Sequence, residues 1–66
     1  MGKGNIYNDI QNGLYDLAIY EINEIKRQNT FLSNYCDKLI DLIESYKNGH
    51  KKYKKDWQPI LEKIIL

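Results

Sequence analysis

The C-terminal half of the chain carries one apolar column on a heptad grid. Steps of alternately four and three residues keep one stripe of a helix facing one partner, so this spacing predicts helices packed on helices. His50 is the only polar member of the column. The column consists of Leu32, Cys36, Leu39, Ile43, Tyr46, His50, Tyr53, Trp57, Ile60 and Ile64.

The N-terminal third predicts one amphipathic helix over about residues 5–27. At about 100° per residue, the apolar side covers more than half of the circumference, which is wider than one neighbouring helix requires. Gly13 lies inside this helix at a cost of about 1 kcal/mol relative to alanine. The apolar side holds Ile6, Ile10, Leu14, Leu17, Ala18, Ile22 and Ile25, and is widened by Tyr7, Tyr15 and Ile19.

Two further helices are predicted, over about residues 30–47 and 50–65. The pair Asn48-Gly49 has the composition of a helix C-terminus. The apolar column nevertheless crosses this pair in phase, so one long bent helix is the alternative to a break. Pro59 then marks either a kink or the first turn of the last helix. The sequence therefore predicts an all-α fold, either a helical hairpin or a small three-helix bundle.

The chain is short enough that packing against another molecule would help to stabilise it. Its 66 residues form a single domain, and a core of this size is marginal. We therefore expect self-association or a protein partner, with His50 able to fix the register of a packed seam. The predicted protein interface is Leu32, Leu39, Ile43, Tyr46, His50, Tyr53, Trp57, Ile60 and Ile64.

The sequence favours a cytoplasmic protein. No charged leader precedes an apolar stretch, and no apolar run approaches the roughly 18 residues of a membrane span. The single cysteine, Cys36, cannot form an internal disulfide, which fits a reducing compartment. The preference for Ile, Asn, Lys and Tyr, whose codons are A/T-rich, indicates an AT-rich bacterial, phage or parasite genome.

Charge divides the chain into an acidic body and a basic end. Residues 1–45 hold four basic and seven acidic side chains, whereas residues 46–66 hold six basic and two acidic ones. A lysine cluster of this kind is typical of a solvated helix face, an acidic protein partner or non-specific nucleic-acid contact. The basic cluster consists of Lys47, Lys51, Lys52, Lys54 and Lys55, with no arginine for base recognition.

The sequence predicts no catalytic residue, metal site or cofactor, and no small-molecule substrate. His50 has no His or Cys three to five residues away, the spacing of zinc ligands. Cys36 and His50 would lie about 21 Å apart along a continuous helix. Glu21 falls within the apolar side of the first helix, where it lies at the edge, is paired with a lysine, or is reserved for a partner, the first two together being favoured.

These features favour a small non-enzymatic regulator or inhibitor that packs its helices against a larger protein, of the kind that phage and mobile elements encode. The alternative is a nucleic-acid-binding accessory protein that uses the lysines of residues 47–55. A helix lying on a membrane surface is a third interpretation, because Trp57 stands beside the lysines.

Overall fold

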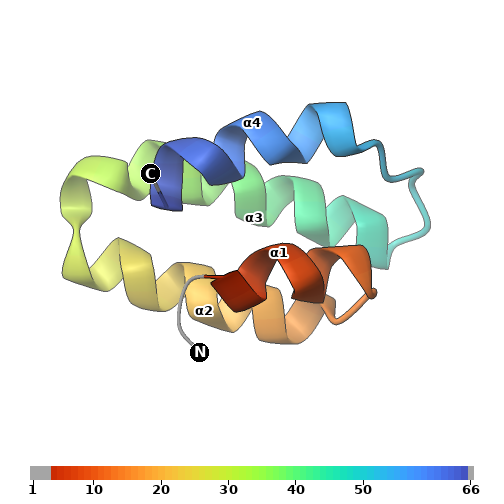
Figure 1. The fold of residues 1–66 in the computed structure, drawn as a ribbon, viewed down its shortest axis with the longest axis horizontal. Coiled ribbons are helices and arrows are strands. Elements are labelled where there is room, and N and C mark those ends of the chain that lie inside the picture. Colours follow the sequence, from red (N-terminus) through yellow and green to blue (C-terminus); the bar gives the residue numbers. More distant parts are fainter. Residues whose placement is uncertain (1–3, 66) are drawn as a thin grey trace.

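The computed structural model describes residues 4–65, with side chains from Ile6 onward, and this part of the chain is all-helical (Figure 1). The predicted all-α class is therefore confirmed, but the predicted hairpin or three-helix bundle is wrong, because the described residues form four α-helices. The described elements are α1 (Gly4–Gln11), α2 (Tyr15–Gln28), a 3₁₀ turn η1 (Thr30–Leu32), α3 (Ser33–Lys47) and α4 (Lys54–Ile65).

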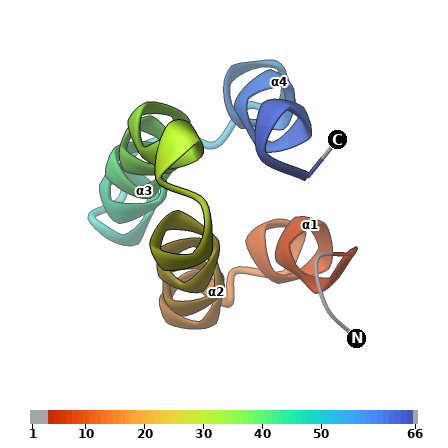
Figure 2. The same ribbon diagram turned by 90° about the vertical axis from the view of Figure 1, so that its left-hand side faces the viewer.

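Each helix packs on the next one along the chain, and the end-on view shows the helices arranged around one centre (Figure 2). The rings of Tyr7 on α1 and Trp57 on α4 close this arrangement, with centroids 5.3 Å apart. The apolar stripe of every helix thus faces a shared core. The buried core residues are Ile6, Ile10, Ala18, Ile22, Cys36, Leu39, Ile43, Tyr46, Trp57, Leu61 and Ile64.

The prediction of one continuous helix over residues 5–27 is wrong, because the chain turns at Gly13. Gly13 has a φ of 79°, a left-handed conformation that glycine adopts without a steric penalty. Its N–H donates to the Ile10 carbonyl at 3.3 Å, and the Leu14 N–H donates to the Asp9 carbonyl at 2.8 Å. These two bonds form a Schellman motif, which satisfies the last carbonyls of α1 and ends the helix.

The same motif ends α3 at Gly49, so the alternative of one long bent helix is wrong. Gly49 has a φ of 101°. Its N–H donates to the Tyr46 carbonyl, and the His50 N–H donates to the Ser45 carbonyl, each at 3.1 Å. The predicted break is therefore confirmed, but α4 begins at Lys54 and not near residue 50.

Pro59 lies inside α4, not in its first turn. Proline cannot donate the hydrogen bond that a helix interior normally makes. The ring is exposed, so the missing bond falls on the solvent side of the helix, where water can satisfy the freed carbonyl.

Candidate functional site

The predicted interface residues are divided between the core and the loop before α4. The break at Gly49 removes His50 and Tyr53 from the column, and both side chains are exposed. Leu32 and Ile60 are half-buried at the edge of the core. Contact of this column with another protein stays a prediction, but most of its members already pack within the chain. The buried ones are Leu39, Ile43, Tyr46, Trp57 and Ile64.

The basic cluster is largely engaged in contacts within the chain. The ammonium groups of Lys54 and Lys55 lie over the rings of Tyr7 and Tyr53, 5.5 and 5.8 Å from the ring centroids. A cation in this position is attracted by the electron-rich ring face. Lys51 is exposed and has no comparable contact in the described part of the chain.

Lys47 joins the end of α3 to the start of α2. Its Nζ lies 2.5 Å from Oδ1 of Asp16, and both side chains are well exposed. The hydrogen bond to Asp16, and then the charge of that carboxylate, raise the pKa of Lys47. Because solvent screens such an exposed ion pair, it contributes little to the free energy of unfolding. The pair therefore orients the Lys47 side chain and does little to stabilise the fold.

Lys52 reaches from the α3–α4 loop to the C-terminal end of α1. Its Nζ donates to the carbonyl of Ile10 and to that of Gln11, the latter at 3.3 Å. It also lies 5.0 Å from the centroid of the Tyr15 ring. A cation here adds a second hydrogen bond to the Ile10 carbonyl, supplies one to the Gln11 carbonyl and interacts favourably with the helix dipole. Lys52 therefore ties the last loop to the first helix.

The turn between α2 and α3 presents the most exposed large apolar side chain of the described residues. Phe31 is 93% exposed. Its backbone is held in place because the Asn29 side-chain carbonyl accepts a hydrogen bond from the Phe31 N–H at 3.2 Å. Burial of this phenyl ring in an apolar pocket of another molecule would be favourable by about 1.5–3 kcal/mol. This turn, residues 29–33, is called the tip below.

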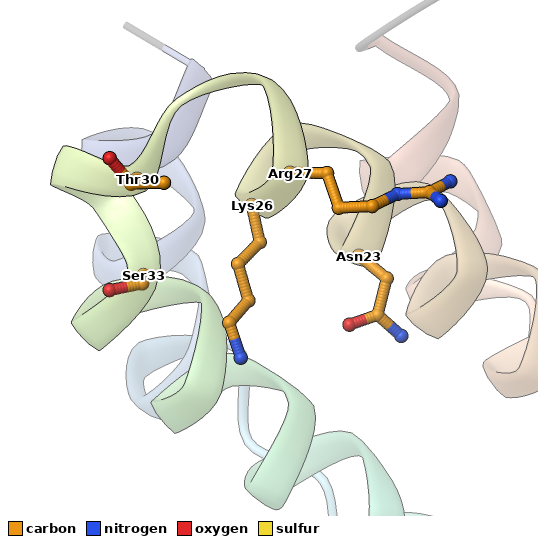
Figure 3. A pocket seen from close by; sticks show the side chains of 5 residues that line it. All are labelled: Asn23, Lys26, Arg27, Thr30 and Ser33. Atoms are coloured by element: carbon orange, nitrogen blue, oxygen red, sulfur yellow. The ribbon is translucent and has the colours of Figure 1, made fainter.

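A hollow of about 660 Å³, formed by polar residue types, lies beside the tip (Figure 3). Lys26 and Arg27 line it, but their side chains run in different directions (Figure 3). Each is paired with an acid: the Nζ of Lys26 lies 2.6 Å from Oδ1 of Asp37, and Arg27 contacts Glu24. The hydrogen bond to Asp37 raises the pKa of Lys26. The hollow therefore lacks a set of converging cations that would hold an anion. Its lining is Asn23, Lys26, Arg27, Thr30 and Ser33.

A groove runs along the seam between α3 and α4. It consists of two hollows of about 420 and 140 Å³ that share Lys38 and Ile60. Leu42 lines the larger hollow, and Lys63 lines the smaller one. Apolar side chains and two lysines therefore border two adjoining hollows, which together are called the α3–α4 groove below. Its remaining lining is Tyr35, Asp41, Ser45 and Pro59.

Two carboxylates lie close to each other where α1 packs on α2. Asp9 is only 7% exposed, and its Oδ2 is buried with no hydrogen-bond partner. Oε1 of half-buried Glu21 is also buried without a partner. Burial, and then the negative charge of Asp9, raise the pKa of Glu21. Glu21 makes no ion pair with a lysine among the described residues, so the pairing considered from the sequence is not found.

This arrangement predicts that Glu21→Gln stabilises the protein at neutral pH. The folded pKa of Glu21 lies above its ordinary value of 4.5, so the folded state binds this proton more tightly than the unfolded state. The resulting stabilisation of the wild type is complete below pH 4.5 and is lost as the pH rises through the folded pKa. Urea unfolding at pH 4 to 7.5 should show an advantage of Glu21→Gln that grows with pH. A difference that is independent of pH, or a less stable variant at pH 7, contradicts this assignment.

Cys36 and His50 do not form a catalytic pair. Cys36 is buried near the start of α3, and burial, then the charge of Asp37, raise the pKa of its thiol, so the reactive thiolate is disfavoured. His50 lies beyond the other end of α3, with Nδ1 3.1 Å from the Ser45 carbonyl. Within residues 4–65, no three His, Cys, Asp or Glu side chains gather as metal ligands would.

Neither a protein-family model nor a curated protein nor a solved structure matches the chain at a significant level. No helix of residues 4–65 has the length and apolar character needed to cross a membrane.

Proposed function

We propose that this chain is a small non-enzymatic regulator or inhibitor that binds a larger protein, and that Phe31 at the tip is its anchor. The observation that carries the proposal is the 93% exposure of Phe31 on a turn whose backbone is held by Asn29. Aromatic side chains that enter a pocket of the partner dominate the energetics of many interfaces.

The order of the tip supports this role energetically. Binding costs free energy wherever a loop or side chain must be immobilised. The Asn29 side chain and the bond from the Leu32 N–H to the Asn29 carbonyl, at 3.1 Å, already fix the backbone on both sides of Phe31. We therefore expect a partner with an apolar pocket that receives the phenyl ring, in contact with the ends of α2 and α3.

The experiment compares tagged wild type, Phe31→Ser and Tyr53→Ser in pull-downs from the source cell, with and without nuclease. Tyr53 is the matched control, an exposed aromatic residue in the loop that follows the other end of α3. We expect the wild type to capture one protein at fixed stoichiometry, with or without nuclease. Tyr53→Ser should capture the same protein with the affinity of the wild type. Loss of an anchor worth about 2 kcal/mol should weaken the binding of Phe31→Ser about 30-fold. Because Phe31 does not pack on the core, Phe31→Ser should unfold at the same temperature as the wild type.

Two results would contradict the proposal. The first is capture of the same protein by Phe31→Ser and wild type with equal affinity. The second is disappearance of the bound material on nuclease treatment, which would transfer the function to nucleic-acid binding by the lysines of residues 47–55.

A further inference from the structure

The two Asn-Gly pairs that end α1 and α3 carry a chemistry that the proposed function does not use. The backbone nitrogen that follows an asparagine can attack the side-chain amide carbon, and glycine hinders this approach least because it has no side chain. Asn12, Gly13, Asn48 and Gly49 are all exposed. Outside the immediate chain neighbours, no atom lies within 4 Å of the position that a Cβ would take at either glycine. The surroundings of both pairs therefore leave room for this reaction.

The reaction is deamidation, and water is its only co-reactant. The glycine nitrogen forms a bond to Cγ of the asparagine, the bond from Cγ to the side-chain nitrogen breaks, and that nitrogen leaves as ammonia with the proton of the glycine N–H. The product is a five-membered succinimide ring. Water then opens the ring at one of its two carbonyl carbons. This hydrolysis gives either aspartate or isoaspartate, in which the backbone runs through the side-chain carbon.

The folded turns oppose this attack at both pairs. The ring closes only when ψ of the asparagine brings the next nitrogen to the side of Cβ, far from helical values, whereas ψ of Asn48 is 8°. The attacking N–H is also engaged: that of Gly13 donates to the Ile10 carbonyl at 3.3 Å, and that of Gly49 donates to the Tyr46 carbonyl at 3.1 Å. Each pair therefore reacts only after its turn opens, and the easier opening decides which asparagine is modified first.

The end of α1 opens more easily than the end of α3. The eight residues of α1 are too few for a helix that is stable by itself in water, whereas α3 has fifteen residues. In addition, α1 packs mostly on α2, whereas α3 packs on both α2 and α4. Lys52 opposes the opening of α1, because its Nζ donates to the carbonyls of Ile10 and Gln11 beside the turn at Gly13. Loss of this lysine should therefore make the opening easier still.

We infer that Asn12 is a site of spontaneous deamidation, that it reacts faster than Asn48 in the folded protein, and that Lys52 slows the reaction by holding the end of α1. Aspartate at this position places a negative charge at the C-terminal end of α1, where the helix dipole disfavours it. Isoaspartate lengthens the backbone within the turn, so the Schellman motif no longer fits. Modification therefore loosens α1 from α2. This inference goes beyond the proposed function and uses no residue of the tip.

Peptide mapping by mass spectrometry, after incubation of the full chain at neutral pH, measures both rates in one sample. Cleavage after glutamate places Asn12 and Asn48 in different peptides, and conversion of the amide to a carboxyl group raises the mass of the peptide. A parallel incubation in guanidinium chloride gives the rates of the unfolded chain, which should be similar because glycine follows both asparagines. In the folded protein, both rates should be lower than in the unfolded chain, and Asn12 should react severalfold faster than Asn48.

Lys52→Met and Lys51→Met test the role of the lysine. Removal of a charged donor from the end of α1 should raise the rate at Asn12 about tenfold in Lys52→Met, whereas Lys51→Met should keep the wild-type rate. Equal rates at Asn12 and Asn48 in the folded wild type, or a faster reaction at Asn48, overturn the inference. An unchanged rate at Asn12 in Lys52→Met overturns it as well. The comparison of the two asparagines needs no variant, and none of these results affects the proposed function, whose test depends on Phe31.

Discussion

Replacing Trp57 by alanine should remove a large part of the protein's free energy of unfolding at 25 °C. Trp57 is the largest fully buried side chain, and its ring packs against Tyr7 where α4 closes on α1. Truncation of a buried tryptophan to alanine costs about 3–5 kcal/mol, because it removes the burial and leaves a cavity. A domain of 66 residues has a total stability of about 3–10 kcal/mol.

Circular dichroism in increasing urea measures this effect, with Trp57→Phe and Tyr53→Ala as comparisons. The phenyl ring of Trp57→Phe fills part of the space left by the indole. The loss in free energy of unfolding should therefore be intermediate in this variant, and measurable even if the alanine variant is unfolded. Tyr53→Ala removes an exposed ring and should change stability by less than about 0.5 kcal/mol. Unfolding of Trp57→Ala at the same urea concentration as the wild type would contradict the position of α4.

Lys52→Met should destabilise the fold by about 2 kcal/mol, whereas Lys51→Met should have almost no effect. The ammonium of Lys52 donates to the last carbonyls of α1, and hydrogen bonds from charged donors contribute about 1.5–3 kcal/mol. Methionine retains most of the apolar stem, so the comparison isolates the charged end. Lys51 is the matched control, one position earlier in the same exposed loop.

The free energy of unfolding of both variants is obtained from urea titration at pH 7 and moderate salt. Equal destabilisation by Lys51→Met and Lys52→Met would contradict a specific role for the hydrogen bonds of Lys52 to α1. It would indicate a general electrostatic effect of the loop. Added salt should only slightly reduce the difference in free energy of unfolding between the wild type and Lys52→Met. Two backbone carbonyls and the Tyr15 ring surround the Lys52 ammonium of the wild type and limit screening.

The helical class, α3 and the break at Gly49 were predictable from local patterns. The break at Gly13 has the same signal, since Asn12-Gly13 repeats the Asn48-Gly49 pair. The apolar phase nevertheless continues from Ile10 to Leu14 across the turn, so periodicity alone indicates one helix. The φ of 79° at Gly13 accompanies the packing of α1 back onto α2. The spacing of apolar residues along a helix does not predict this tertiary contact.

The same limit applies to α4. The column predicts Trp57, Ile60 and Ile64 as its inner face, and the structure buries Trp57, Leu61 and Ile64. A loop of six residues interrupts the helix, so the phase of α4 is set by its contact with α1 and α3. Ile60 turns to the edge of the core, where it lines the α3–α4 groove.

The candidate surfaces were the least predictable part. Phe31 lies outside the heptad column, in a short turn where a single aromatic residue gives no periodic signal. The basic cluster was evident from composition, but its contacts with Tyr7, Asp16 and the end of α1 depend on the packing of distant segments. Sequence patterns identify which residues carry charge, whereas tertiary structure determines which charges remain available to a partner.

Most of the heptad column closes on the core of its own chain, so its buried members are not exposed at the surface. Two-dimensional NMR of the wild type tests this most directly. We expect NOE cross peaks between the ring protons of Tyr7 and Trp57, whose centroids lie 5.3 Å apart, and non-helical chemical shifts from Gly49 to Tyr53. Helical shifts that continue through residues 48–54, without any Tyr7–Trp57 cross peak, would contradict it.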